Sequence, residues 1–178
     1  MNACFGGGTV RQDLNVILDG ENSEANLNGI YAGLKDSHID NHISIFHKKP
    51  HTKSNQKYKG VLDDQSRGVF NGKVIIERDA QKTDAAQINK NLLLSDKAEV
   101  DTKPELCVDA DDVKAAHGAT VSQLDDNEVF YLQTRGISRE VAERMLARGF
   151  LEEVLYEQKK SQIRSQLENV FSKFFPRV

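Results

Sequence analysis

The chain has 178 residues, 38% hydrophobic and 29% charged, so it is long enough to bury a core and too apolar to be disordered. Its net charge of −3 gives no electrostatic reason to expect a nucleic-acid partner. Because it has neither the ~20-residue apolar run of a membrane span nor a secretory signal in residues 1–8, we expect a protein of the cytoplasm, or of the plastid stroma in a plastid-bearing organism.

Residues 9–122 are predicted to form short strands and turns, because side chains of one kind recur at every second position. The first series ends at Asp19-Gly20, a pair typical of a turn. Period two places each series on one face of a strand. The series are Leu14, Val16 and Leu18; Ala25, Leu27, Gly29 and Tyr31; Ile39, Asn41, Ile43 and Ile45; Phe70, Gly72, Val74 and Ile76; and Leu106 with Val108.

The connections between these strands limit the architecture to two alternatives. Helical segments are not evident between the strands, which argues against a doubly wound α/β sheet. An antiparallel sandwich and a parallel β-helix remain. Asn28-Gly29 and Asn71-Gly72 are interpreted as turns, which suit hairpins and solenoid corners alike. Since no repeat of fixed period is visible, periodicity alone does not choose between the two architectures.

Residues 123–178 are predicted to form a second, helical domain after the strand domain of residues 1–122. Asp125 or Asp126 is expected to cap a short helix that Gly136 ends, and Ser138 to cap a second helix. The second helix carries Val141, Met145, Leu146, Phe150 and Val154, and the third carries an apolar stripe of Ile163, Leu167, Val170, Phe171 and Phe174.

The apolar stripe of the third helix has two interpretations. It packs on the preceding helix, as such stripes usually do. Alternatively, part of it contacts another protein, because exposed apolar patches mark interfaces. Both hold if opposite edges of the helix pair serve the two purposes.

Four of the five histidines lie close together in the sequence: His38, His42, His47 and His51. The alternation around Ile43 favours a strand, which separates His38 from His42 by about 13 Å. One metal cannot bind both at that distance, since its bonds to nitrogen are only ~2 Å long. These histidines are therefore expected to face solvent or a subunit interface.

No sign of an active site is found in the sequence. Adjacent acids such as Asp63-Asp64 point to opposite faces of a strand and are better explained as turns or helix caps. Gly6–Gly8 lacks the Lys-Ser/Thr element of a phosphate-binding loop. Cys4 and Cys107 are predicted to be reduced thiols, and two cysteines are too few to hold an iron–sulfur cluster alone.

Several segments match one known family in the same order along the chain. They are Pro50–Gln56, Tyr58–Gly60, Ser66–Val74, Asp79–Thr83, Asn91–Ser95, Thr102–Pro104, Asp111–Lys114, His117–Thr120, Phe130–Leu132 and Arg135–Ile137. On these residues the chain resembles the C-terminal portion of the SufD branch of the SufB/SufD family of iron–sulfur cluster assembly proteins. The His-Gly-Ala-Thr segment beginning at His117 favours SufD, because SufB typically has Glu after this His.

The resemblance implies a mainly β chain, a right-handed parallel β-helix lacking the family's N-terminal region, followed by a C-terminal α-helical subdomain. It also implies a scaffold subunit rather than an enzyme, which pairs with SufB through the β-helix, docks the ATPase SufC through the C-terminal helices and contributes to iron supply. The expected SufC contacts are Val141, Met145, Phe150, Ile163, Leu167, Phe171 and Phe174.

His117 matches a family His implicated at the SufB–SufD interface and is the one candidate metal ligand, shared with the partner. The family commonly has Cys two residues earlier, where this chain has Ala115. No cofactor is therefore expected on the chain alone, while iron or an iron–sulfur cluster is expected at the interface with SufB. In isolation, exposed strand edges are expected to favour a homodimer.

Two competing functions stay open at this point. A solenoid carbohydrate-active enzyme would need carboxylates that converge on one face of the rod. A plain homo-oligomeric structural module would need neither a sister subunit nor an ATPase.

Overall fold

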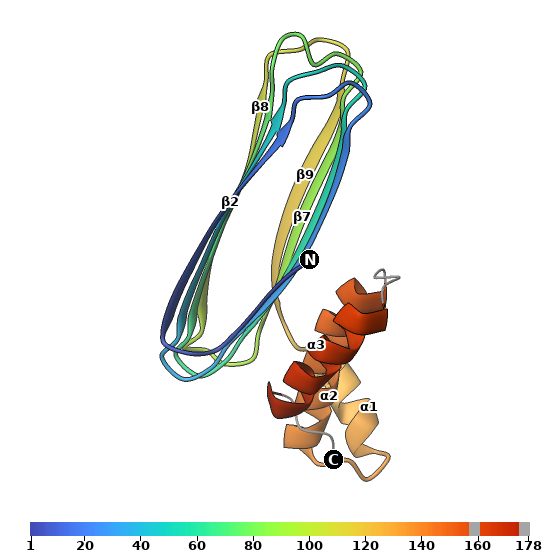
Figure 1. The fold of residues 1–178 in the computed structure, drawn as a ribbon. Coiled ribbons are helices and arrows are strands. Elements are labelled where there is room, and N and C mark those ends of the chain that lie inside the picture. Colours follow the sequence, from blue (N-terminus) through green and yellow to red (C-terminus); the bar gives the residue numbers. More distant parts are fainter. Residues whose placement is uncertain (157–160, 175–178) are drawn as a thin grey trace.

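The computed structural model describes residues 1–156 and 161–174, which form a two-sided parallel β-helix followed by three helices (Figure 1). Sheet A contains, in order, β1 (Asn2–Phe5), β3 (Glu24–Gly33), β5 (Lys53–Leu62), β7 (Asp84–Leu93) and β9 (Lys114–Gln123). Sheet B contains β2 (Thr9–Leu18), β4 (His38–His47), β6 (Arg67–Ile76) and β8 (Glu99–Val108). Every pairing in the two sheets is parallel, so the β-helix is confirmed and the antiparallel sandwich is excluded.

Each coil of the β-helix takes between 27 and 32 residues. Thr9 lies beside His38, 29 positions later, and Arg67 lies beside Glu99, 32 positions later. The strands β2 to β9 each have 10 residues, so the expectation of short strands is wrong. Uneven coil length and polar residues at inward positions hide the repeat in the sequence.

The corners of the rod are built by residues in the left-handed region of backbone space, which residues other than glycine rarely adopt. Asn22, Lys35, His51, Asp64 and Lys82 have φ between 55° and 60°. Corners on successive coils stack, since the Asn22 N–H donates to Pro50 O and the His51 N–H to Gln81 O. Asp64 also accepts a hydrogen bond from the Lys35 N–H at 2.8 Å, so this acid belongs to a turn as predicted.

The interior of the rod is filled by the inward residues of both sheets, including Tyr31, Ile43, Tyr58 and Phe70. Gly29 and Gly72 lie within β3 and β6 rather than at turns, so the interpretation of both Asn-Gly pairs as turns is wrong. A Cβ at Gly29 would lie 2.1 Å from the Tyr58 ring, because the glycine makes room for that ring.

The three helices are α1 (Asp126–Gln133), α2 (Arg139–Tyr156) and α3 (Ser161–Phe174). Asp125 caps α1 by accepting a hydrogen bond from the Asn127 N–H at 2.8 Å, and Ser138 Oγ lies 3.4 Å from the Val141 nitrogen at the start of α2. Gly136 follows α1 with a φ of 82°. These observations confirm the predicted caps. Within the described ranges, none of the helices is both long and apolar enough to cross a membrane.

A second core joins the helices to the outer face of sheet A. Leu151, Val154, Leu167 and Phe171 are buried there, against Ile30, Ala32, Val61 and Leu92 of the sheet. The rings of Phe5 and Phe171 are 5.4 Å apart in an edge-to-face arrangement. The change from strand to helix falls between Gln123 and Asp126, and the division into two domains stays a prediction.

Lys59, an outward residue of β5, is buried where this strand meets α2. Its ammonium group donates a hydrogen bond to the Phe150 carbonyl at 2.9 Å, lies 4.2 Å from the centre of the Phe150 ring, and forms an ion pair with Glu153. Lys57 lies 3.0 Å from the same carboxylate. The hydrogen bond from Lys59, and to a lesser extent that from Lys57, lowers the pKa of Glu153 to about 2. A charged contact therefore anchors α2 on the rod.

Candidate functional site

The last coil of the rod ends in two strands that each have a single neighbour in the described part of the chain. β9 pairs only with β7, and β8 pairs only with β6. We call these two strands the open end. Their outer edges present unpaired backbone groups, which are a template for pairing with another chain. The inward side chains of β9 are exposed here, as Val121 shows.

His117 lies on the inward side of β9 at the open end. It pairs in register with Gln87 of β7, which pairs with Gln56 of β5, so the three side chains form one row along sheet A. Gln56 and Gln87 are buried, whereas His117 is exposed. The structure therefore places the candidate ligand at the edge of the rod, where a partner chain could reach it.

Ala115 occupies the position where the family commonly has Cys. It lies on the same side of β9 as His117 and packs against the buried residues in the interior of the rod. Its methyl group has no metal-binding atom, so within this segment the imidazole of His117 has no thiolate beside it.

Cys107 does not replace the missing cysteine. It is exposed on β8, where it alternates with the inward-facing Leu106 and therefore points out from sheet B. Cys4 is buried, and this burial raises the pKa of its thiol. Both cysteines are free, as predicted. His117 can therefore contribute one metal ligand at the open end, and further ligands would have to come from another chain.

Three of the other four histidines lie on β4, and His51 lies at the corner that follows it. His42 faces outward and its Nε2 lies 2.8 Å from Asp40 Oδ1, while His51 is exposed at a corner. His47 is fully buried, so the expectation that it faces solvent or an interface is wrong. Five positions separate His47 from His42, which puts the two on opposite faces of β4.

The buried His47 ring is held by two hydroxyl groups. Nδ1 lies 2.8 Å from Thr52 Oγ1, and Nε2 lies 2.8 Å from Ser54 Oγ. Burial lowers the pKa of His47 to about 4, because the charged imidazolium is poorly solvated there. Among the described residues, no group of three or more His, Cys, Asp or Glu side chains is arranged to hold a metal ion.

The helices expose a second candidate surface next to the open end. Phe130 is 66% exposed, Tyr131 57% and Met145 47%. Leu146 lines a shallow apolar cavity of about 390 Å³ together with Tyr131, and a second cavity together with Met145. We call these four residues the helix patch. A cavity of about 430 Å³ connects it with the end of β9 and includes Leu124 and Phe150 in its lining.

The seven residues expected to contact an ATPase are divided by the structure. Met145 is exposed, and Val141, Phe150 and Phe174 are half-buried. Leu167 and Phe171 are buried in the second core, so they hold α3 against sheet A and α2. The Ile163 side chain lies outside the described residues. Phe130 and Tyr131 were missed because the sequence pattern of α1 does not show which of its apolar residues remains uncovered.

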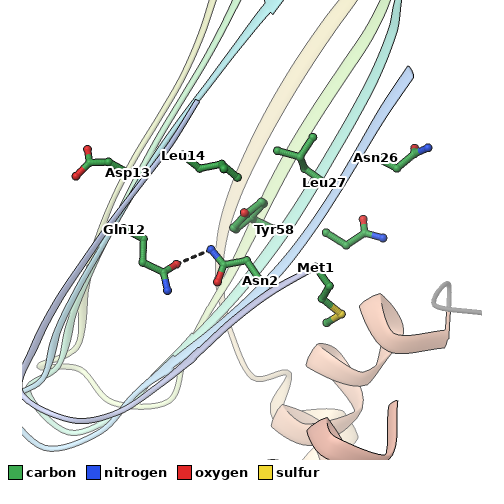
Figure 2. A pocket seen from close by; sticks show the side chains of 9 residues that line it. Met1, Asn2, Gln12, Asp13, Leu14, Asn26, Leu27 and Tyr58 are labelled. Carbon is green, nitrogen blue, oxygen red and sulfur yellow. Dashed lines mark hydrogen bonds between the residues drawn. The ribbon is translucent and has the colours of Figure 1, made fainter. Parts of the chain in front are cut away.

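A cavity of about 550 Å³ lies at the opposite end of the rod (Figure 2). Asn2, Gln12 and Tyr58 point into it, and the Asn2 amide donates a hydrogen bond to Gln12 Oε1. Its lining includes one carboxylate, Asp13, which forms an ion pair with Arg11 at 2.9 Å. This cavity therefore lacks the pair of carboxylates that most glycoside hydrolases use.

Comparison with known proteins identifies the family of this chain. Residues 1–150 match the family model described as "SUF system FeS cluster assembly, SufBD core domain". The iron–sulfur cluster assembly protein SufD of Escherichia coli (strain K12) is 40% identical over 150 residues, 84% of this chain and 36% of the relative. SufD of Bacillus subtilis (strain 168) is 40% identical over 114 residues, 64% of this chain and 26% of the relative.

A third relative covers more of the chain. A SufBD family protein of Mycobacterium leprae is 34% identical over 175 residues, 94% of this chain and 45% of the relative. The chain thus spans about a quarter to a half of the length of these three relatives. The resemblance drawn from the sequence segments is confirmed, and the chain belongs to the SufBD core family of the SUF iron–sulfur cluster assembly system.

Proposed function

We propose that this chain is a non-catalytic scaffold subunit of iron–sulfur cluster assembly. It pairs with a SufB-type sister through the open end of its β-helix and docks a SufC-type ATPase through its C-terminal helices. The observation that carries this proposal is the open end itself, where unpaired strand edges and the exposed His117 lie side by side.

Pairing through the open end is supported by its backbone and by the size of its side chains. A sister β-helix can continue both sheets, because β8 and β9 present unpaired N–H and C=O groups. Around His117 the strand carries Ala115, Ala116, Gly118 and Ala119, and such small side chains let another backbone approach closely. In the absence of a sister chain, the same edges would pair two copies of this chain.

The cargo of this interface is iron or an iron–sulfur cluster, held between the two chains. His117 supplies one nitrogen ligand from this side, and the sister chain supplies the others, since Ala115 and the outward-facing Cys107 supply none. Through His117 at this interface, the chain would also contribute to iron supply. Clusters usually need about four protein ligands, which is why this chain alone would not hold one.

The ATPase docks at the helix patch. Phe130, Tyr131 and Met145 expose apolar surface on two adjacent helices, and exposed apolar patches typically mark protein interfaces. Val141 and Phe150 are half-buried residues of α2 and stay candidate contacts. Leu167 and Phe171 support the patch indirectly, by fixing α3 in the second core.

Reconstitution with purified SufB and SufC tests the proposal. Native mass spectrometry should show one complex that contains all three chains, and Met145→Ser should remove SufC while SufB stays bound. Anaerobic iron loading of the complex should fall with His117→Ala and stay unchanged with His51→Ala, a matched substitution at an exposed corner. Failure to bind either partner would contradict the proposal, and a stable homodimer that ignores both partners would favour the plain structural module.

A further inference from the structure

We propose that Gln87 is a positioning residue for His117: its buried side-chain oxygen accepts a hydrogen bond from one ring N–H of His117 and thereby fixes which ring nitrogen faces the open end. This inference rests on the proposed function only where it makes His117 a ligand for the cargo. The proposed hydrogen bond would involve this chain alone, and it would satisfy a Gln87 oxygen that has no partner among the described residues.

The register of the sheet brings the two side chains together. Gln87 and His117 are paired residues on neighbouring strands, so their Cα atoms are about 4.8 Å apart and their side chains leave the sheet on the same side. Gln87 is 1% exposed, and its Oε1 atom is buried without a hydrogen-bond partner among the described residues. An acceptor in this state is unfavourable, and the ring of His117 is the donor that the next coil offers to it.

The Gln87 amide is paired with its other neighbour in the row. Its Nε2 group donates a hydrogen bond to Gln56 Oε1 at 2.8 Å. Rotating the Gln87 amide alone by half a turn would place two carbonyl oxygens against each other and lose that bond. In this arrangement the donor end of the amide is directed to the preceding coil, which leaves the oxygen for the following coil, where His117 lies.

Gly72 of sheet B holds the amide in this position from the opposite wall of the rod. A Cβ at Gly72 would lie 2.1 Å from Gln87 Nε2, so the side chain of Gln87 crosses the interior and fills the space that the glycine leaves. Such a tightly enclosed amide cannot reorient easily. In this arrangement the Gln87 donor is used by Gln56, and the Gln87 oxygen is left for His117.

The Gln87 oxygen would determine which ring nitrogen of His117 carries the hydrogen. A neutral His carries one N–H and one nitrogen with a free lone pair. If the N–H points to Gln87, the lone pair is on the other nitrogen and points away from the buried row. Metal-binding histidines commonly use this arrangement, in which an acceptor behind the ring fixes its tautomer and orientation. Gln87 would act through His117 without touching the cargo.

The ring nitrogens of His117 provide the first test, in the full chain without metal. Long-range ¹H–¹⁵N NMR near pH 8, assigned with His117→Ala, should show one dominant tautomer in the wild type. Gln87→Met, which has similar length and no acceptor oxygen, should convert this into a mixture of both tautomers. Thr102→Val is the matched control, because it removes a hydrogen bond to Asn89 at the same end of the rod and leaves the Gln87 row intact.

The wild-type spectrum alone can overturn the proposal, even if Gln87→Met does not fold. Averaged tautomers in the wild type would exclude a fixed hydrogen bond to His117. The same holds if Gln87→Met folds and keeps the wild-type tautomer, or if Thr102→Val changes it as strongly as Gln87→Met does.

A cobalt(II) titration of the complex with the SufB-type sister, followed by visible absorption, gives the second test. Gln87→Met should weaken cobalt binding by roughly ten- to a hundredfold, the usual effect of losing the group behind a ligating His. Unchanged affinity in Gln87→Met, where His117→Ala abolishes binding, would overturn the positioning role. If wild type and His117→Ala bind cobalt equally, the ligand role of His117 is wrong, and the tautomer measurement alone decides the hydrogen bond.

Discussion

The middle coils of the rod and its open end contain the same row of positions in opposite environments. Gln56 and Gln87 are buried in the middle coils, and His117, at the next step of that row, is exposed. Gly29 lies against the Tyr58 ring, whereas a Cβ at Gly118 of the last coil would meet nothing within 4 Å. A residue's place in the stack, more than its type, therefore decides what it contacts.

This difference explains how one repeating backbone can serve both stability and recognition. In the middle coils a polar inward side chain must find its partner inside the chain, as Gln87 does with Gln56. At the open end the following coil is absent from the described residues, so inward side chains and strand edges are available to another chain.

Adding one methyl group to a middle-coil glycine should have the largest effect. The Gly29→Ala methyl would collide with the Tyr58 ring, which is itself buried against Phe70 at 5.3 Å between ring centres and has no room to move. We expect unfolding free energy to fall by about 3 kcal/mol or more, measured by urea denaturation. Gly118→Ala should change it by less than about 0.5 kcal/mol. Equal effects at the two positions would contradict the distinction between coils.

Buried His47 should make the middle coils sensitive to acid. Its pKa in the folded state is about 4, below the usual value of 6.5, so the unfolded chain binds a proton first as the pH falls. The contribution of neutral His47 to the unfolding free energy is fully present above about pH 6.5 and is lost as the pH falls toward 4. We expect the unfolding free energy to fall by about 2 kcal/mol between pH 7.5 and pH 5. Urea denaturation at several pH values measures this slope.

His47→Gln provides the control for this slope, because glutamine keeps polar contact with Thr52 and Ser54 and does not titrate. The variant should be less stable near pH 7.5 and lose less stability on acidification. A slope equal to that of the wild type would show that His47 is not the group responsible.

Part of this fold was predictable from local pattern, because alternation and capping act over a few residues. The inward faces of β4 and β6, with Ile43 and Val74 among their buried residues, and the caps at Asp125 and Ser138 agree with the structure. The choice of a β-helix came from the family resemblance, since sandwich and solenoid share the same alternation.

The remaining features depend on contacts between coils, which local pattern does not contain. Glycine is required at positions 29 and 72 because a Cβ there would collide with Tyr58 and Gln87 respectively. These side chains lie 29 and 15 positions further along the chain. Counting alternation through β4 would have found that His47 points inward. The first interpretation of the apolar stripe anticipates the burial of Leu167 and Phe171, but their contact with sheet A could not be predicted, because this sheet forms far earlier in the sequence.

Neutralising Glu153 should affect the junction of rod and helices more than the rod itself. Glu153→Gln leaves the buried Lys59 ammonium without its carboxylate. Because about half of Glu153 is exposed, solvent screens the pair, and we expect a loss of about 1 kcal/mol, seen as faster hydrogen exchange in α2. Adding Lys59→Met should recover part of this loss, since both charges are then gone. Faster exchange throughout the rod would contradict a local junction.

Substitutions in the helix patch should have the smallest effect on folding and a large effect on binding. Tyr131 is 57% exposed, and its hydroxyl contacts Arg135 of the same region, so Tyr131→Ser should change unfolding free energy by less than about 0.5 kcal/mol. If the patch docks the ATPase, this variant should bind SufC at least tenfold more weakly, measured by calorimetry, because exposed aromatic residues often dominate interface energy. Phe171→Ala is the informative contrast, since it empties part of the second core and should lose both stability and binding. SufC binding unchanged in Tyr131→Ser would place the docking surface elsewhere on the chain, and a loss of stability in this variant would contradict a small role of Tyr131 in folding.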